Sequence, residues 1–463
     1  MLQNKFKIGQ EIDLEILDLA FGGKGIAKLN NLTVFVKSGI PGQTISARIT
    51  KIKKSYLEAK HIKTLKKSKF ETKPKCDHFP TCGGCSFQQL SYKKQLEYKQ
   101  KQIYDIFERI GEVQKPKINK IIGSNKKYYY RNKMEFTFSD NPWYIADESY
   151  DKIVLGLHVP KRFDKILNVD DCHIQDKIFN DILKFIREKS IKLNLEPYNV
   201  RKHVGLLRYL IFKIGIYTNE IMLNIVTAKE ENKIIKLSEI ILKEFPEVTT
   251  IVNTINSTKS NTAIGQKEHI IYGKGYINEK IGKYKFRISP SAFFQTNSFQ
   301  VKTLYDYILK ISEINKEDVI FDLFSGTGTI AIYLANKAKK AYGFEIVEDA
   351  VNDANINAKN NNIDNVIFYL GDIKNLFDKK NDLNIEKPDI VIIDPPRPGL
   401  HLNTIKYLLK ELPKKIIYVS CNATTQARDM NLLIEKYSII DIQPIDLFPH
   451  TPHIENILTL LKK

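Results

Sequence analysis

The stretch FDLFSGTGTIAIYLA, residues 321–335, decides the fold of the carboxy-terminal third of the chain. An apolar strand pattern ends in a loop that holds Gly326 and Gly328, and an apolar helix pattern follows directly. Strand and helix patterns alternate around it, which is typical of a parallel, doubly wound sheet. The predicted strands cover residues 319–324, 341–345, 366–372, 389–396, 415–421 and 453–461. We therefore predict a Rossmann-like domain over residues 291–463.

Acidic residues follow the second and third predicted strands. Open α/β sheets bind ligands outside the carboxyl ends of their strands, so these residues face the expected cleft. Glu345 could take ribose hydroxyls, and Asp372 could meet an adenine. The glycine loop reads DxFxGxGT rather than GxGxxG. Together these features favour S-adenosylmethionine as the cofactor, and a nicotinamide dinucleotide is the alternative for the glycine loop alone.

The fourth and fifth predicted strands end in DPPRPG, residues 394–399, and in SCNA, residues 420–423. Two prolines lock the first of these turns and would hold Asp394 in a fixed geometry at the cleft. Cys421 lies at the next strand end. A cysteine there could be only a small buried apolar residue, but its neighbours favour a role in catalysis.

Glu455 begins the last predicted strand, after the segment FPHTPHI. Methylation of a pyrimidine at C5 needs a nucleophile that adds to C6 and a base that later removes the C5 proton. A cysteine thiolate is a suitable nucleophile, and a carboxylate is a suitable base. Cys421 and Glu455 are the two groups that this reaction needs.

The positive charge of the chain is concentrated in its first two thirds. The 463 residues carry a net charge of +19, yet residues 300–463 contain 20 Lys+Arg and 22 Asp+Glu, so residues 1–299 contain 52 and 31. Such an asymmetry is typical of nucleic-acid binding. A lysine-rich composition would explain the amount of lysine but not its distribution. With no apolar run of 18 residues and no signal-peptide pattern, we expect a cytoplasmic protein without membrane contact.

The amino-terminal region has four short strand patterns, at residues 11–16, 32–36, 43–49 and 56–62, separated by AFGGKGIAKL and GIPG. They predict an OB-like β-barrel over residues 1–62. This segment resembles a TRAM domain, an RNA-binding barrel that is attached to RNA-modifying enzymes.

Residues 63–290 are predicted to form a central α+β domain with an RNA-binding surface. A helix over residues 91–111 begins after Ser91, and we expect that it can pack on the catalytic domain. Aromatic and basic residues alternate in KKYYYRNK, residues 126–133, a mixture that suits single-stranded RNA. Cys76, Cys82, Cys85 and Cys172 form a set of four thiols, whose spacing leaves zinc and a cubane cluster equally open.

The motifs FFQTN (293–297), FDLFSGTGT, DPPRPG, SCN and FPHTPHIE occur in an order that resembles the bacterial RNA uracil-C5-methyltransferases. The similarity is to the 23S ribosomal RNA branch, which carries a TRAM domain and an iron–sulfur cluster. It implies that Cys421 is the nucleophile and Glu455 the general base. It implies that the contacts to S-adenosylmethionine are made by Gln295, Phe324, Thr329, Glu345, Asp372 and Asp394.

The same resemblance implies a [4Fe-4S] cluster on the four cysteines, with zinc as the alternative. Two departures from the family pattern are visible: Ala423 replaces the usual proline after SCN, and Ser325 stands where a cysteine is common. Neither departure removes a chemical group from the reaction. The chain is thus predicted to be a multidomain α/β protein with a TRAM barrel, a central domain with a four-cysteine cluster, and a Rossmann-like methyltransferase domain.

The expected reaction forms 5-methyluridine in 23S ribosomal RNA, and we expect a monomer with no obligate protein partner. A cytosine-C5 enzyme is an alternative, but such enzymes resemble a layout with a second cysteine after the prolines, where this chain has Arg397. A transfer-RNA enzyme is a second alternative. The barrel and the four cysteines argue against it, because the transfer-RNA branch of the family that this chain resembles lacks both. A catalytically idle RNA-binding factor is the third, and the intact Cys421 and Glu455 argue against it.

Overall fold

The chain forms two compact units in the computed structural model, which describes residues 6–144, 153–373 and 385–463. The first unit joins the amino-terminal part to two short segments of the carboxy-terminal third. It consists of Met1–Asn125, Cys421–Asn431 and Asp441–Asn456, and the second unit consists of Lys126–Ser420, Leu432–Ile440 and Ile457–Lys463. The division into domains at residues 62 and 290 stays a prediction.

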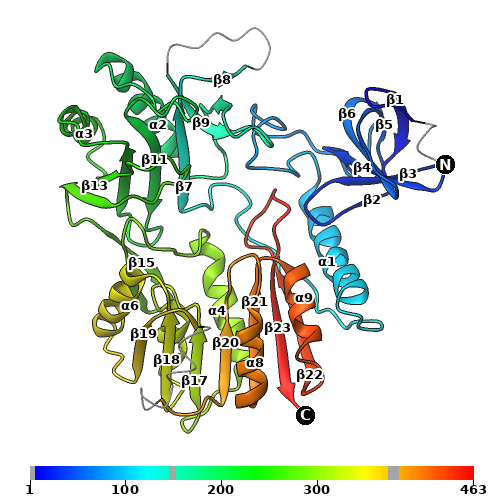
Figure 1. The fold of residues 1–463 in the computed structure, drawn as a ribbon, viewed down its shortest axis with the longest axis vertical. Helices are drawn as coiled ribbons and strands as arrows, with labels where there is room; N and C mark the ends of the chain where they lie inside the picture. Colours follow the sequence, from blue (N-terminus) through cyan, green and yellow to red (C-terminus); the bar gives the residue numbers. More distant parts are fainter. Residues whose placement is uncertain (1–5, 145–152, 374–384) are drawn as a thin grey trace. The chain divides into compact units, whose positions relative to one another are not determined.

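A six-stranded sheet begins the first unit, in the order β1-β5-β6-β4-β3-β2 (Figure 1). Its strands are β1 (Glu11–Glu15), β2 (Asp18–Leu19), β3 (Gly25–Leu29), β4 (Leu32–Lys37), β5 (Thr44–Ile52) and β6 (Tyr56–Lys66). Strands β4 and β6 pair in parallel, and the other pairs are antiparallel. Ile45, Ala47 and Ile49 alternate with more exposed residues along β5 and belong to one apolar core. The four predicted strands are confirmed.

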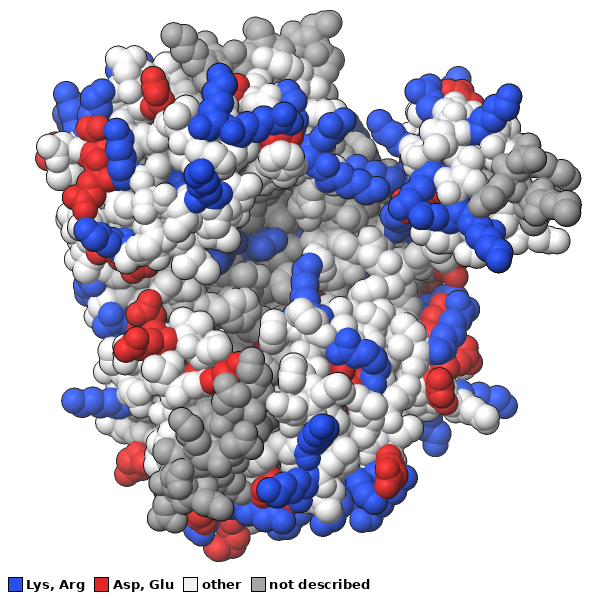
Figure 2. Space-filling view, viewed as in Figure 1, with Lys and Arg blue, Asp and Glu red and all other residues white. Residues whose placement is uncertain are grey.

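Strand β3 forms inside AFGGKGIAKL, which the sequence pattern indicated to be a turn. Gly25 packs so closely that a Cβ atom there would lie 2.8 Å from the carbonyl oxygen of Gly39. The glycine is therefore a place where two backbones approach, which is one of the uses of glycine within strands. Over this sheet, the face shown in Figure 2 carries more Lys and Arg than Asp and Glu side chains.

Helix α1 (Tyr92–Arg109) begins after Ser91, whose backbone is extended but whose side chain makes no capping hydrogen bond. Its apolar face includes the buried Ile103 and Phe107, and the predicted helix over residues 91–111 is present. The polar side is also buried in part, because Gln95, Lys99 and Gln102 are at most 4% exposed. Helix α1 contacts α9 (Ala423–Asn431), which belongs to the same unit.

An eight-stranded sheet, with the order β14-β13-β12-β11-β7-β9-β10-β8, begins the second unit (Figure 1). Its strands are β7 (Lys133–Ser139), β8 (Pro142–Trp143), β9 (Val154–His158), β10 (Ile166–Asn168), β11 (Leu207–Ile214), β12 (Ile221–Thr227), β13 (Val248–Ile255) and β14 (Lys267–Tyr272). Helices α2 (Lys177–Lys192) and α3 (Lys233–Glu244) accompany it, and a hairpin of β15 (Ile277–Ile281) and β16 (Tyr284–Ile288) follows. The predicted mixture of strands and amphipathic helices is confirmed.

A seven-stranded sheet has the order β19-β18-β17-β20-β21-β23-β22. Its strands are β17 (Val319–Leu323), β18 (Lys340–Glu345), β19 (Val366–Leu370), β20 (Ile390–Ile393), β21 (Lys415–Ser420), β22 (Tyr437–Ile445) and β23 (Glu455–Lys462). The helices that alternate with them include α4 (Ser298–Ser312), α5 (Thr329–Ala335), α6 (Glu348–Asn360) and α8 (Leu402–Glu411).

Strands β19, β18, β17, β20 and β21 pair in parallel, which confirms the predicted doubly wound arrangement. The order reverses between β17 and β20, where ligands bind in such sheets. Within the described ranges, no helix combines the length and the apolar character that crossing a membrane requires.

Candidate active site

The glycine loop leaves β17 in a left-handed backbone conformation. Phe324, Gly326 and Gly328 all have positive φ angles, of 66°, 52° and 78°. A Cβ atom at Gly328 would lie 2.5 Å from the ring of Phe368, so the tight turn into α5 requires glycine there. A Cβ atom at Gly326 would meet nothing within 4 Å. The backbone at Gly326 is thus open to the approach of a ligand.

Glu345, at the end of β18, is bonded to this loop. Its Oε2 atom accepts a hydrogen bond from the Gly326 N–H at 2.9 Å, and its Oε1 atom accepts from the N–H groups of Ile346 and Val347 at 2.8 and 2.9 Å. The carboxylate therefore holds the ends of β17 and β18 together. The Oε2 atom, which accepts one of these bonds, has further acceptor capacity, which suits it to a ribose hydroxyl.

Two further carboxyl groups lie at the switch point. Asp322 is 1% exposed within β17, and its Oδ2 atom accepts the Ala331 N–H at 2.9 Å. Burial raises the pKa of Asp322 to about 8, and the charges of Asp394 and Glu345 also raise it. Burial likewise raises the pKa of Asp394 to about 7. Asp322 is a polar residue inside the apolar run VIFDLF, and no role was predicted for it.

The loop that carries Gln295 places this side chain next to Asp394, and hydrogen bonds from other segments hold the loop in position. The Gln295 side-chain amide donates to Asp394 Oδ2 at 3.2 Å, an interaction that favours the ionised carboxylate. Asn132 donates to the Gln295 carbonyl oxygen at 2.9 Å, and Lys213 donates to the carbonyl oxygens of Ser289 and Ala292 at 2.8 and 2.9 Å. Asn132 and Lys213 precede this loop by many residues in the sequence, so their part in shaping it was not predicted.

The remaining predicted cofactor residues lie at the same strand ends. Thr329 begins α5, and its hydroxyl is 2.7 Å from that of Tyr305. Asp372 follows β19 and is half-buried. The open backbone at Gly326, the carboxylate of Glu345 and the paired Gln295 and Asp394 fit S-adenosylmethionine, whose ribose needs hydrogen-bond acceptors and whose cationic sulfonium favours acidic surroundings.

Cys421 follows β21 and is half-buried in the first unit. The next residue, Asn422, shapes the start of α9. Its side-chain oxygen accepts the Thr424 N–H at 3.2 Å, and its carbonyl oxygen accepts the Gln426 N–H at 3.2 Å. Ala423 occupies the first position of α9, where proline is also well tolerated, so the departure from the family pattern leaves the helix start intact.

Glu455 is 2% exposed at the start of β23, which neighbours β21 in the sheet. The next residue, Asn456, forms a reciprocal amide pair with Gln426 of α9. Gln426 Nε2 donates to the Asn456 carbonyl oxygen at 3.0 Å, and Asn456 Nδ2 donates to Gln426 Oε1 at 2.7 Å. The segment that carries Cys421 and the residue beside Glu455 are thus joined directly.

The loop before Glu455 is fixed by the buried polar face of α1. Lys99 donates to Asp446 Oδ1 at 2.7 Å and to the Phe448 carbonyl oxygen at 3.1 Å, and both members of this ion pair have fully buried side chains. Tyr92 donates to Asp446 Oδ2 at 2.8 Å. The Gln95 side chain accepts the His450 N–H at 3.0 Å and lies 3.1 Å from His450 Nδ1.

The segment that follows Cys85 contacts the loop before Glu455 through its backbone. The N–H groups of Ser86 and Phe87, directly after Cys85, donate to the His450 carbonyl oxygen at 2.8 and 3.0 Å. His450 has a positive φ of 65°, a conformation that a histidine adopts only when its surroundings hold it. No role was predicted for Tyr92, Gln95 and Lys99, because their contacts to this loop could not be identified without the fold.

The four cysteines do not form a metal site in the part of the chain that the structure describes. No three His, Cys, Asp or Glu side chains among those residues are arranged to hold a metal ion. Cys76, Cys82 and Cys85 belong to the first unit and Cys172 to the second. Burial raises the pKa of the Cys172 thiol. The iron–sulfur cluster therefore stays a prediction.

Comparison with known families assigns both ends of the chain. Residues 91–463 match the family described as tRNA (Uracil-5-)-methyltransferase, and residues 5–62 match the TRAM domain. A protein of Bacteroides thetaiotaomicron described as an uncharacterized RNA methyltransferase is 38% identical over 452 residues, which cover 96% of this chain and 99% of that protein. A similarly described protein of Chlorobaculum tepidum is 38% identical over 98% of this chain and 96% of its own.

One solved structure resembles the chain over nearly its whole length. It is the Pyrococcus abyssi tRNA (uracil-54, C5)-methyltransferase in complex with S-adenosyl-L-homocysteine, with a TM-score of 0.78 and 30% identity. The match covers 97% of this chain and 99% of that one. On these grounds the chain belongs to the tRNA (uracil-5-)-methyltransferase family and is an S-adenosylmethionine-dependent RNA methyltransferase with an amino-terminal TRAM domain.

Proposed function

We propose that the chain transfers a methyl group to C5 of a uridine in 23S ribosomal RNA and forms 5-methyluridine, as a monomer in the cytoplasm. The observation that carries the chemistry is the pair Gln426–Asn456, which joins the segment of Cys421 to that of Glu455. A nucleophile and a buried carboxyl group held in this way are the two side chains that C5 methylation needs.

In the proposed mechanism the Cys421 thiolate adds to C6 of the uracil, and the electron pair of the C5–C6 double bond moves toward C5. S-adenosylmethionine, when bound, would supply the methyl group to C5 and would leave as S-adenosylhomocysteine. The Glu455 carboxylate then removes the proton from C5, the double bond forms again, and the C6–S bond breaks to release Cys421 as the thiolate. The target base has to leave its stack for Cys421 to reach C6 from the ring face.

The cofactor would be held by the second unit. Glu345 and Asp372 would take its ribose and adenine, and the loop of Phe324 and Thr329 would lie along it. Support for this placement comes from the open backbone at Gly326 and from the Gln295–Asp394 hydrogen bond. These residues bind and orient the cofactor, and they take no proton in the reaction.

A transfer RNA is the second candidate substrate, and one observation favours it. The Pyrococcus tRNA enzyme matches 97% of this chain, so the match leaves out about 14 of 463 residues and includes most of residues 5–62. The prediction against a transfer RNA used the amino-terminal barrel and the four cysteines as its arguments. The match of a tRNA enzyme to nearly the whole chain speaks against the first of these arguments.

The test is incubation of the purified protein with radiolabelled S-adenosylmethionine and either unmodified 23S ribosomal RNA or unmodified transfer RNA, followed by nucleoside analysis. Label in 5-methyluridine from the ribosomal RNA is the expected result. Label in 5-methyluridine from transfer RNA alone would replace the substrate and keep the mechanism. Label in 5-methylcytidine would overturn the assignment of the base, and no label in either RNA, with cofactor binding intact, would favour an idle RNA-binding factor.

A further inference from the structure

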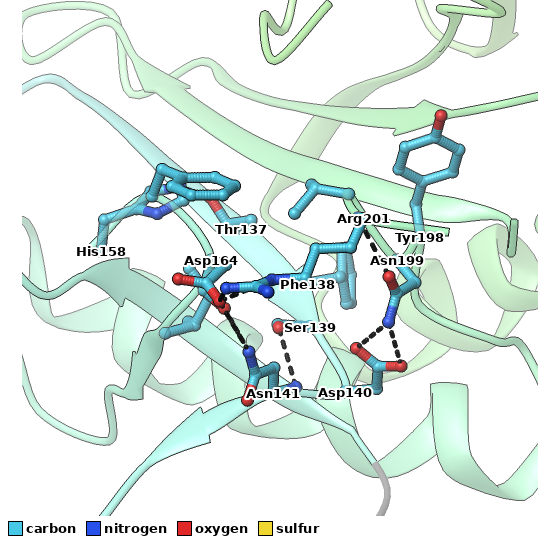
Figure 3. Close-up of a pocket in the computed structure, with 13 residues that line it drawn as sticks. Thr137, Phe138, Ser139, Asp140, Asn141, His158, Asp164, Tyr198, Asn199 and Arg201 are labelled. Atoms are coloured by element: carbon cyan, nitrogen blue, oxygen red, sulfur yellow. Dashed lines mark hydrogen bonds and ion pairs between the residues drawn. The ribbon is translucent and has the colours of Figure 1, made fainter. Parts of the chain in front are cut away.

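A small pocket lies in the second unit (Figure 3). None of the residues that line it belongs to the candidate active site. Three segments form it: the turn after β7, the loop between β9 and β10, and the segment before β11. Its interior is small, with a volume of about 30 Å³. The interest of the pocket lies in what its walls present to solvent.

Both carboxylates of the pocket are already used by neighbouring side chains. Arg201 donates from Nε and Nη2 to Asp164 Oδ2 at 3.0 and 2.6 Å (Figure 3). Asn199 donates to the two oxygens of Asp140 at 3.1 and 2.8 Å, and Asn141 donates to the Asp164 carbonyl oxygen at 2.9 Å. These hydrogen bonds hold the Arg201 guanidinium in one orientation. Asp140 and Asp164 both accept hydrogen bonds from neighbouring side chains, so neither presents an unpaired negative charge to a ligand.

An exposed aromatic ring stands beside this guanidinium. The Phe163 side chain lines the pocket and is 60% exposed, and the centre of the Arg201 guanidinium lies 5.7 Å from its ring centroid. Hydrogen bonds from the Val159 N–H to Lys165 and from the Arg162 N–H to Val159 close the loop that carries the ring. An exposed phenyl ring is a surface on which an unpaired base can stack, and Arg201 places a cation over this ring.

The two loops that carry Phe163 and Arg201 are rich in positive charge. The loops of residues 159–165 and 199–203 contain five Lys and Arg residues, against Asp164 and the neighbouring Asp140. Of these five, Lys161, Arg162 and Lys202 are exposed in addition to Arg201. Phosphates on either side of a stacked base would meet these cations. An acidic peptide would also meet them, but it would make no use of the exposed Phe163 ring for stacking.

We propose that these two loops form an accessory RNA-binding site that stacks one unpaired base on Phe163 and contacts the adjoining phosphates through Lys161, Arg162 and Lys202. The site rests on the proposed function in that its ligand is the RNA substrate. The RNA bound there would lie outside the candidate active site. The site would therefore contribute to affinity rather than to chemistry.

The test compares Phe163→Ala with Tyr272→Ala, which removes another exposed aromatic ring of the same unit, from β14. Full-length proteins are titrated into a fluorescein-labelled, unstructured RNA of 20 nucleotides, and binding is followed by fluorescence anisotropy. Phe163→Ala should weaken binding about 10-fold, the size expected for loss of one base–aromatic stack. Tyr272→Ala and Phe163→Trp should bind as the wild type does.

Two other measurements separate the possible ligands and the two proposals. Replacement of Lys161, Arg162 and Lys202 by alanine should reduce the slope of log Kd against log salt by about 2, as expected for three phosphate contacts to a single strand. If Phe163→Ala and wild type bind this RNA equally while polyglutamate competes, the site takes an acidic peptide and the proposal fails. Because binding is measured without methylation, a failure to methylate unmodified 23S ribosomal RNA would count against the proposed function and would leave the result of this titration unchanged.

Discussion

At the scale of single residues, Cys421 and Glu455 were predicted from chemistry that a sequence can display. A cysteine at a strand end and a glutamate at the start of the last strand are rare enough to be noticed, and the fold places their strands next to each other. Asp322 was missed because its neighbours are all apolar, so its position reads as core. Only the fold shows that it lies within the influence of Asp394 and Glu345.

The first prediction concerns Glu455→Gln. The amide keeps the size of the side chain but cannot take a proton, so the covalent adduct between Cys421 and C6 should form and persist. We expect a protein–RNA band on a denaturing gel and a turnover rate at least 100-fold below the wild type. Glu435→Gln, which changes a glutamate with an 80% exposed side chain, is the matched control. Normal turnover in Glu455→Gln would remove this residue from the mechanism.

The second prediction concerns Asp322→Asn and pH. Burial raises the pKa of Asp322 to about 8 from an ordinary value of 3.8, so between these values the folded chain holds a proton that the unfolded chain releases. The free energy of unfolding should therefore fall as pH rises from about 4 to about 8 through this group. Asparagine removes that dependence and can still accept the Ala331 N–H.

Asp322→Asn should accordingly unfold at a higher temperature than the wild type at pH 9, and the difference should shrink toward pH 4. Thermal unfolding followed by circular dichroism at several pH values measures it. Asp13→Asn, at an exposed position of β1, controls for the loss of one negative charge. A midpoint difference that is the same at pH 5 and pH 9 would show that Asp322 does not stay protonated in the folded state.

At the scale of elements, most helices and strands were predicted because their apolar residues repeat with a clear period. Strand β22 was missed. Pro444 lies within it, and a proline in a strand pattern argues against a central strand. The fold resolves this conflict because β22 is the last strand in the order, and beyond it the Pro444 carbonyl oxygen accepts the Ile122 N–H at 3.0 Å while the Gln443 side chain donates to the Lys120 carbonyl oxygen at 3.0 Å.

Helix α1 carries the third prediction, through its buried ion pair. Lys99→Met would leave Asp446 buried without its cation, which costs about 3–5 kcal/mol when a buried pair is broken. The loop before Glu455 should loosen, so both the unfolding temperature and kcat should fall. The double variant Lys99→Met with Asp446→Asn should recover part of the lost stability, because it leaves no unpaired charge. Additive losses in the double variant would mean that the pair is not coupled.

At the scale of the whole molecule, the composition of the two units could not be predicted from the sequence. Lys99 and Asp446 lie 347 positions apart, and no local pattern relates them. The return of residues 421–431 and 441–456 to the amino-terminal unit follows from such contacts. The parallel sheet and its cofactor edge were predictable, in contrast, because each βα step is encoded by neighbouring residues.

The fourth prediction concerns the metal content of the intact protein. If Cys76, Cys82, Cys85 and Cys172 bind a [4Fe-4S] cluster, protein purified without oxygen should be brown and contain about four iron and four sulfide ions per chain. Cys85→Ser should lose them, whereas Cys421→Ser should retain them. Colourless protein with one zinc ion per chain would identify the same cysteines as a zinc site. Protein without either metal would leave the four thiols as ordinary side chains, in line with the geometry of the described residues.

The last prediction follows from the distribution of charge. Residues 1–75 contain 16 Lys+Arg and 6 Asp+Glu, whereas residues 300–463 are close to neutral. Each phosphate contact to single-stranded RNA contributes about 0.7 to the slope of log Kd against log salt. Replacement of the exposed Lys63, Lys66 and Lys67 by glutamine should therefore lower that slope by about 2, if all three contact phosphates.

The matched control replaces three exposed lysines of the carboxy-terminal third, Lys387, Lys406 and Lys410, and it changes the net charge by the same amount. Filter binding of the full-length proteins to unmodified ribosomal RNA between 50 and 200 mM salt, on the order of the range over which such binding falls steeply, measures both slopes. Equal slopes for the two triple variants would mean that total charge, rather than its position, attracts the RNA. A smaller slope for the amino-terminal variant alone would identify the basic segment as the part that grips the substrate.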